Sequence, residues 1–286
     1  MSFGFDLYSA FQNLTNGIFD HEVVLIYKLQ DSFLNIKNYY PNYSAAIDII
    51  HGSKGQVKFT YNGSAISSIS TGTVMQRELA DMLFIVFSSK KSEIRLMYLQ
   101  NKKGKREDYF KADLLQLYLL HERCEIISSP LPDCTFNNSK ILKDAVLPSV
   151  GSYGVFYQKQ KTVDMAYYPA NLVFPCSPIG RSVSRYVNYN SCNFSKNQSI
   201  NNFIESQGEI NLENFGNSLI DMKIGTPINN KNDYFRDVVS FLKNNSTVFS
   251  EAEMAKRFEN YSDNSKDKKI FDGVSTVLIF DADKIV

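Results

Sequence analysis

Hydrophobic and polar residues follow recognisable periods along the first part of the chain. From about Phe5 to Ile49, apolar residues recur at spacings of three and four, with a break at Tyr39 to Pro41, and this pattern predicts two helices. Residues 56–61 and 64–70 alternate between apolar and polar side chains on either side of Asn62-Gly63. Because both residues of an Asn-Gly pair tolerate positive φ, the pattern predicts a β-hairpin with a two-residue turn.

The next segments predict a second antiparallel pair and a helix. Two apolar runs of strand length, 82–87 and 94–99, flank a polar turn. Residues 109–123 follow a basic loop, contain neither glycine nor proline, and place apolar residues on one face, so they predict a helix. Weaker patterns predict strands at 124–127, 153–157, 170–174 and 275–280, and helices at 233–243 and 250–259.

The composition limits the class of protein. A chain of 286 residues with 43% hydrophobic residues can bury a sizeable core, so one elaborated domain or two interlocked domains are expected. The formal net charge is +1, so any phosphate-binding surface must come from local clustering of charge. No secretory signal is recognised, and no apolar run approaches the roughly 20 residues of a membrane span, so a cytoplasmic protein outside the membrane is expected. The four widely spaced cysteines predict buried thiols rather than a metal or disulfide site.

The candidate chemistry lies where the second antiparallel pair ends. Asp81 directly precedes the first apolar strand, and Gln100 and Lys102 follow the second. Strand alternation places Gln100 and Lys102 on one face and Asn101 on the other. Because the outer ends of an antiparallel pair lie side by side, we expect a carboxylate, an amide and an ammonium to meet at one edge of the sheet.

The pattern Asp81-x18-Gln100-x-Lys102 resembles the PD-(D/E)xK nuclease superfamily, whose restriction endonucleases carry Asp and Glu-x-Lys on adjacent strands between helices. The resemblance covers residues 56 to 128, and it departs from the family pattern twice: Ala80 replaces the proline, and Gln100 replaces the usual glutamate. It implies an α/β, restriction-endonuclease-like fold with a mixed central sheet flanked by helices. An additional C-terminal α+β region is expected beside this fold.

The resemblance also implies roles for individual residues in phosphodiester hydrolysis with Mg²⁺, for which Mn²⁺ can substitute. Asp81 is the expected central metal ligand, Gln100 the second ligand through its side-chain oxygen, and the backbone carbonyl of Asn101 a third. Lys102 is expected to orient or deprotonate the attacking water and to stabilise the transition state. Glu78 is a further candidate ligand if the chain is helical there. A match of this kind also arises by chance, as a capped strand, a surface glutamine and a solvated lysine.

Local charge adds a candidate DNA surface. Residues 90–106 contain seven basic residues and one acid, and residues 151–200 combine basic residues with tyrosines. The proposed phosphate contacts are Lys90, Lys91, Lys103, Lys105, Arg106, Arg181 and Arg185, and Ser182, Arg185 and Asn188 are candidates for reading base edges. Gln116 and Tyr118 can face the active centre or serve packing alone.

The expected protein is therefore a Mg²⁺-dependent endonuclease acting on double-stranded DNA, with residues 1–150 as the nuclease core. Residues 151–286 are expected to continue the core and to add a DNA-recognition or dimerisation region. A type II restriction endonuclease, with a second copy of the chain as a candidate partner in a homodimer, is the first interpretation. A less specific nuclease effector of another defence or repair system and a non-catalytic DNA-binding module of the same fold are the alternatives, and RNA as substrate stays open.

Overall fold

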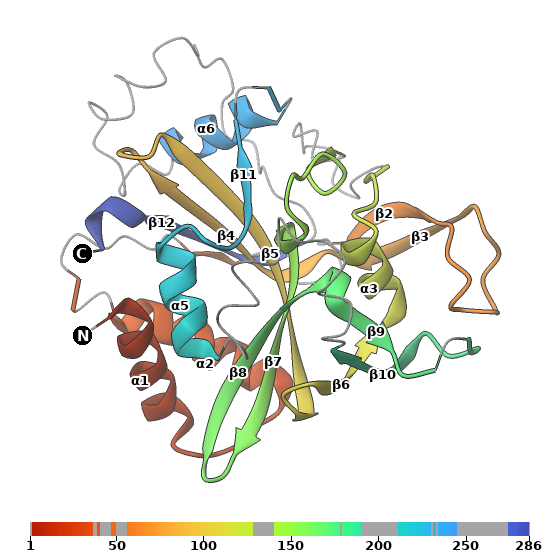
Figure 1. Ribbon diagram of the computed structural model, residues 1–286, viewed down its shortest axis with the longest axis horizontal. Coiled ribbons are helices and arrows are strands. Elements are labelled where there is room, and N and C mark those ends of the chain that lie inside the picture. Colours follow the sequence, from red (N-terminus) through yellow and green to blue (C-terminus); the bar gives the residue numbers. More distant parts are fainter. Residues whose placement is uncertain are drawn as a thin grey trace.

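The chain forms an α/β structure in which a mixed, curled sheet carries helices on both faces (Figure 1). The computed structural model describes residues 2–36, 39–40, 47–49, 56–127, 140–177, 179–189, 211–229, 231–232, 234–244 and 274–285. Among these residues, no helix is long and apolar enough to cross a membrane.

Two helices open the chain, and helices then separate groups of strands. The helices are α1 (Phe3–Thr15), α2 (Glu22–Asn35), α3 (Leu114–His121), η4 (Pro148–Val150), η5 (Ala170–Leu172), α5 (Leu212–Ile220), α6 (Phe235–Asn244) and η8 (Ala282–Lys284). The strands are β1 (Ile47–Ile49), β2 (Gln56–Tyr61), β3 (Thr73–Glu78), β4 (Ala80–Ser88), β5 (Glu93–Arg106), β6 (Tyr109–Asp113), β7 (Gly151–Lys159), β8 (Thr162–Pro169), β9 (Val173–Pro175), β10 (Ser184–Tyr189), β11 (Thr226–Ile228) and β12 (Val274–Asp281).

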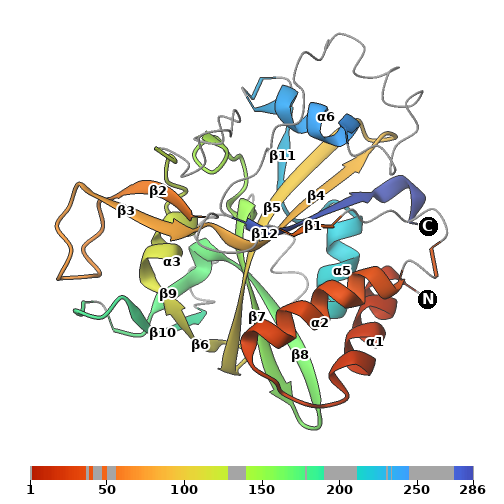
Figure 2. The same cartoon turned by 180° about the vertical axis from the view of Figure 1, so that it is seen from behind.

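The long strand β5 organises the main sheet. Its first half pairs with β4 in antiparallel register, Met82 opposite Leu99, and also with the short β11. Its second half pairs in parallel with β7, which continues into β8, and its end pairs with β6. On the other side of β4 lies β12, which runs parallel to it (Figure 2). Strands from both halves of the sequence therefore build one sheet.

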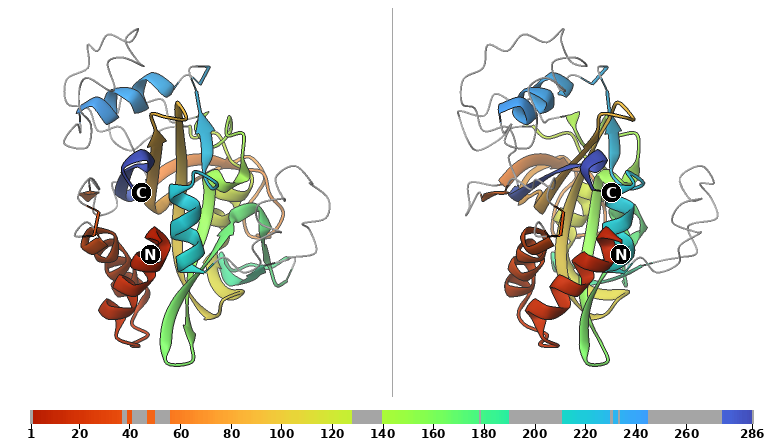
Figure 3. Two further views of the ribbon diagram at one scale, coloured as in Figure 1. Left: turned by 60° about the vertical axis from the view of Figure 1, so that its left-hand side comes forward. Right: turned by 90° about the vertical axis from the view of Figure 1, so that its left-hand side faces the viewer.

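Alternation along β4 divides the interior into two cores. Leu83 and Ile85 point to the face covered by α3 and α6, whereas Met82 and Phe84 point to the face covered by α1, α2 and α5 (Figure 3). Buried aromatic rings fill the second core, in which Phe84 contacts rings of α2, α5 and β12. Because β4 is buried on both faces, its sequence is a continuous apolar run after its second residue.

Several predicted elements are confirmed. The apolar runs 82–87 and 94–99 pair as β4 and β5, and residues 153–157, 235–243 and 275–280 fall in β7, α6 and β12. Two N-terminal helices form, but they are separated at residues 16–21 and not at the predicted break after Tyr39, and Ile47–Ile49 at the end of this segment is the strand β1. The predicted helix 250–259 lies outside the described residues.

The predicted two-residue hairpin turn is wrong. The partner of β2 is 73–78, not 64–70, and residues 62–72 form a loop. The loop is closed because Gly72, at φ 85°, donates its N–H to the carbonyl of Tyr61 and to Oδ1 of Asn62. Asn62 and Gly63 do not adopt the positive φ that a tight type I′ turn requires.

The predicted helix 109–123 begins too early, and the basic loop before it is strand. β5 continues to Arg106, β6 occupies 109–113, and α3 starts only at Leu114 because Asp113 caps it by accepting the N–H groups of Leu115 and Gln116. Residues 124–127 form no strand, and 170–174 is mostly the short helix η5. The strand β8 and the helix α5 were not predicted. Cys124 is half-buried and Cys176 exposed, so neither is the fully buried thiol that was expected, and Cys134 and Cys192 lie outside the described residues.

Candidate active site

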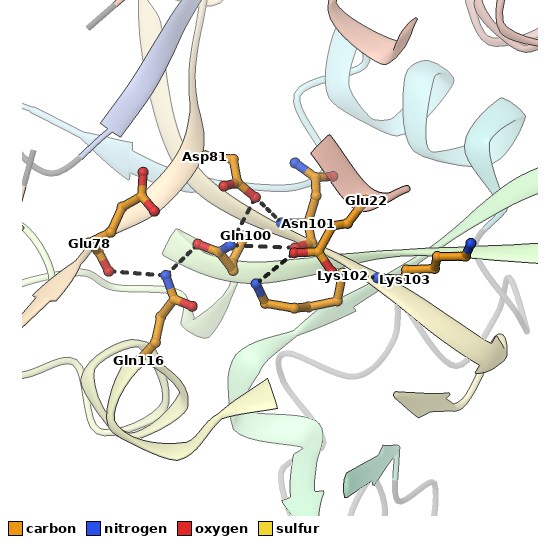
Figure 4. Close-up of polar contacts among 8 residues, drawn as sticks. All are labelled: Glu22, Glu78, Asp81, Gln100, Asn101, Lys102, Lys103 and Gln116. Atoms are coloured by element: carbon orange, nitrogen blue, oxygen red, sulfur yellow. Dashed lines mark hydrogen bonds and ion pairs between the residues drawn. The ribbon is translucent and has the colours of Figure 1, made fainter. Parts of the chain in front are cut away.

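Asp81 and Gln100 lie opposite each other on β4 and β5, as the sequence predicts. Asp81 is the second residue of β4 rather than the residue before it, and Gln100 lies within β5. The Asp81 Oδ2 atom accepts a hydrogen bond of 2.9 Å from Gln100 Nε2 and one of 2.6 Å from the backbone N–H of Asn101 (Figure 4). The two side chains are 8% and 2% exposed, so this carboxylate is held inside the sheet edge.

Gln116 extends this contact from the first turn of α3. Its Nε2 atom donates to Oε1 of Gln100 at 2.5 Å and to the backbone carbonyl of Glu78 at 3.0 Å. One of the two helix residues that the sequence placed near the centre therefore reaches it. The other, Tyr118, packs against Phe59 and accepts the N–H of Asn62, away from Asp81.

The charge of Lys102 acts on the same carboxylate, and Lys102 is paired with Glu22. Its Nζ atom lies 3.2 Å from Glu22 Oε1, and the backbone N–H of Lys103 donates to Glu22 Oε2 at 2.9 Å. Glu22, the first residue of α2, thus binds the part of β5 that extends beyond its pairing with β4. Sequence reasoning missed Glu22, because an acidic residue at a helix start is common and its only signal is a favourable helix dipole.

Burial raises the pKa of Asp81 to about 7. The charge of Lys102 and the hydrogen bond from Asn101 favour the carboxylate but do not outweigh burial, and the nearby charges of Glu78 and Glu22 act against it. A carboxyl group with this pKa ionises near neutral pH, where a cation beside it would stabilise the charged form.

The raised pKa of Asp81 predicts a pH-dependent stability. The contribution of Asp81 to the free energy of unfolding is fully present below about pH 4, where the pKa of an unfolded aspartate lies. It is lost as pH rises to about 7, at roughly 1.4 kcal/mol per pH unit. Urea denaturation between pH 4 and pH 8 without divalent ions should show this decline. Asp81→Asn should remove it, whereas Asp31→Asn, at an exposed aspartate of α2, should not. A decline that persists in Asp81→Asn would contradict the assignment.

Glu78 does not lie on a helix, so the condition for its ligand role is not met. It ends strand β3, where its carbonyl accepts from Gln116. Its side-chain charge nevertheless acts on Asp81. Glu78 therefore influences Asp81 through its charge and positions Gln116 through its backbone carbonyl.

Two buried polar groups beside the centre have no hydrogen-bond partner within the described part of the chain. Both side-chain polar atoms of Asn101 are unpaired next to Gly154 of β7, and so is the hydroxyl of Tyr153, which is opposite Gln100 in the β5–β7 register. Burial and the charges of Asp113 and Asp81 hold the pKa of Tyr153 well above its usual range. The interior around Asp81 is thus unusually polar.

The predicted basic surface is divided in the structure. Lys90 and Lys91 lie in the β4–β5 turn, roughly 25 Å along the strands from Asp81, where they contact Asp283 and the carbonyl of Asp221. Lys103 follows Lys102 on β5 and donates to the carbonyl of Phe19, which lies between α1 and α2. The seven basic residues of 90–106 therefore do not form one surface.

Lys105 and Arg106 lie at the far end of β5, beside two stacked tyrosines. The rings of Tyr109 and Tyr186 are parallel within 3°, with centroids 4.7 Å apart. Lys105 Nζ lies 4.9 Å from the centroid of Tyr186, and the Arg106 guanidinium lies 5.7 Å from that of Tyr109. Together these four residues form a cationic aromatic cluster.

The residues proposed to contact DNA on β10 and in the loop before it differ in exposure and in their partners. The Arg185 guanidinium donates to the carbonyls of Ser177 and Ala65, so it joins two loops of the protein. Arg181 is exposed, and its carbonyl accepts from Ser68. Ser182 donates to the carbonyl of Ser184, and Asn188 is exposed beside β6.

Comparisons with known proteins identify no relative. No family model, no curated protein and no solved structure matches the chain. Its chemistry must be argued from its own residues.

The donor atoms at Asp81 suit a hard cation such as Mg²⁺. No group of three Asp, Glu, His or Cys side chains is close enough to hold a metal ion among the residues described here. Mg²⁺, however, is commonly held by one or two carboxylates together with water and phosphate oxygens. Both hydrogen bonds that described residues donate to Asp81 end on Oδ2, and the carbonyl of Asn101 lies beside Gln100. Asp81 Oδ1 and this carbonyl are oxygen atoms of the kind that Mg²⁺ binds.

Proposed function

We propose that the chain is a Mg²⁺-dependent endonuclease that hydrolyses phosphodiester bonds of double-stranded DNA, and that it acts as a type II restriction endonuclease. The observation that carries the proposal is the meeting of Asp81, Gln100 and Lys102 on adjacent antiparallel strands, with Asp81 buried and its pKa raised to about 7. The mixed sheet with helices on both faces supports the resemblance stated above. A homodimer cutting both strands is the arrangement we propose.

The residues of the chain have distinct tasks in this proposal. Bound Mg²⁺, or Mn²⁺ in its place, supplies charge neutralisation at the scissile phosphate and an activated water. Asp81 and the Asn101 carbonyl would hold the ion. Lys102 orients the attacking water and stabilises the charge that develops on the phosphate. Glu22 keeps the Lys102 ammonium in place and near Asp81 before DNA binds.

The cationic aromatic cluster of Lys105, Arg106, Tyr109 and Tyr186 is the proposed contact with the DNA backbone. Lys105 and Arg106 follow Lys102 on the same strand, so DNA that reaches the centre passes close to them. The tyrosine rings hold both cations in place at the surface by cation–π contact. Arg106 also pairs with Asp108, which partly offsets its charge.

Lys105→Gln should weaken DNA binding in a salt-dependent way. Removal of one phosphate contact should make the negative slope of log K against log salt less steep by about 0.9. Fluorescence anisotropy with a labelled duplex, measured without divalent ions at several salt concentrations, gives this slope. Lys90→Gln, in the distant β4–β5 turn, is the matched control. A slope that changes in Lys90→Gln and not in Lys105→Gln would move the DNA surface to that turn.

The function itself is tested with unmethylated phage DNA and Mg²⁺, compared with a chelator, Asp81→Ala and Lys102→Ala. Discrete fragments that disappear in all three controls support a restriction endonuclease. A smear that disappears in the same controls supports a less specific nuclease effector. DNA that is bound but not cut overturns the catalytic proposal in favour of a binding module. The orientation of the Gln100 amide supports this second candidate, because Nε2 and not the oxygen faces Asp81.

A further inference from the structure

Two glutamine side chains connect α3 to the carboxylate of Asp81. Gln116 Nε2 donates to Gln100 Oε1, and Gln100 Nε2 donates to Asp81 Oδ2 (Figure 4). Gln116 is 5% exposed and Gln100 2% exposed, so water does not compete freely for either amide.

Backbone groups fix the direction of this chain of hydrogen bonds at both ends. At one end the carbonyl of Glu78 can only accept, so the NH₂ group of Gln116 must face it. At the other end the N–H of Asn101 can only donate, so Asp81 Oδ2 must accept. Reversing either amide alone would bring two acceptors or two donors into contact. A single orientation therefore satisfies every partner.

We infer that Gln116 and Gln100 form an amide relay in which Gln100 acts as a positioning residue for Asp81 and not as a metal ligand. The oxygen of Gln100, the atom that would bind a cation, faces Gln116 and lies on the side of the amide away from Asp81. The NH₂ group of Gln100 faces Asp81 and donates to Oδ2, which leaves Oδ1 as the Asp81 oxygen that would hold an ion. The role assigned to Gln116 and Gln100 in metal binding rests on the proposed function, whereas the relay itself does not.

The relay explains how the chain tolerates glutamine where the resembling family has a glutamate ligand. A glutamate at position 100 would place a second carboxylate at the position of the Gln100 NH₂ group, beside Asp81 Oδ2. The amide instead offers a donor to Asp81 and an acceptor to Gln116, which a carboxylate cannot do at once. Gln116 on α3 thereby couples the position of the helix to the carboxylate.

The relay is tested first in the metal-free, full-length protein. NMR scalar coupling across hydrogen bonds should connect Gln100 Nε2 to the Asp81 carboxyl carbon and Gln116 Nε2 to the Glu78 carbonyl carbon. Gln116→Met should weaken the coupling to Asp81, because Gln100 keeps only one of the two side-chain partners that fix its orientation. Gln30→Met removes another buried glutamine, which donates to Thr276, and should leave the coupling unchanged. Absence of the coupling in the wild-type protein, or a coupling in Gln116→Met as large as in the wild type, would overturn the relay.

The second measurement separates a positioning role from a ligand role by comparing two variants. Gln116→Met should weaken binding of Mn²⁺, followed by its electron paramagnetic resonance signal, by roughly tenfold to a hundredfold. Gln100→Met should weaken it by a similar factor, and the double variant should be no worse than either, because both act in one relay. If Gln100 were a ligand, Gln100→Met would remove a donor atom from the ion and Gln116→Met would not, so a clearly larger loss in Gln100→Met would overturn the positioning role. An intact NMR coupling in a protein that cuts no DNA would leave the relay standing and reject only the proposed nuclease.

Discussion

Asp81→Asn is expected to abolish Mg²⁺-dependent DNA cleavage, with a loss of at least about a thousandfold in rate. The amide has the shape of the carboxylate and can still accept the hydrogen bonds from Gln100 and Asn101, but it carries no charge to hold the ion. The initial rate of plasmid nicking in Mg²⁺ measures the effect.

The isosteric change separates lost chemistry from lost folding. Because the buried charge disappears, Asp81→Asn should be more stable than the wild-type protein at pH 8 without metal. A variant that is stable and inactive supports the metal-site role of Asp81. Residual cleavage within tenfold of wild type, with a folded protein, would place the active centre elsewhere.

Lys102→Ala should produce the second large loss, roughly a hundredfold to ten-thousandfold in cleavage rate, with DNA binding nearly retained. Lys102 is the ammonium whose charge acts on Asp81. Single-turnover cleavage at saturating enzyme separates the chemical step from binding. Lys102→Arg should restore charge but not the compact ammonium, so it should remain well below wild type.

Lys28→Ala is the matched control for Lys102. Lys28 is similarly buried and is paired with Asp20, as Lys102 is with Glu22, but it lies within α2. It should cleave at the wild-type rate. Equal losses in Lys28→Ala and Lys102→Ala would indicate a general effect on the N-terminal helices and would remove Lys102 from the chemistry.

The position of Asp81 relative to Gln100 was predictable because it depends on short-range features. The apolar runs of β4 and β5 and the polar turn between them set an antiparallel register, and that register places the two residues opposite each other. The division of β4 between two cores follows from the same alternation. The general α/β class follows from the order of the elements.

The rest of the site depends on contacts that sequence periods do not contain. Glu22 reaches Lys102 from 80 residues upstream, and Gln116 reaches Gln100 only because Asp113 caps α3 four residues later than the apolar pattern begins. The direction of the Gln100 amide is set by the carbonyl of Glu78, a backbone group that no side-chain pattern reveals. The start of the helix was predicted at Tyr109, too early, because the Asp113 cap and not helix propensity decides where α3 begins.

The strand β12 ties completion of the sheet beside Asp81 to a late step of synthesis. β12 runs beside β4, with Val274 opposite Ala80, the residue before Asp81, although about 190 residues separate the two strands. While a ribosome is still making the chain, β4 lacks this neighbour and one of its edges stays open. A nascent chain therefore cannot complete the sheet around Asp81 until residues 274–281 have emerged and paired.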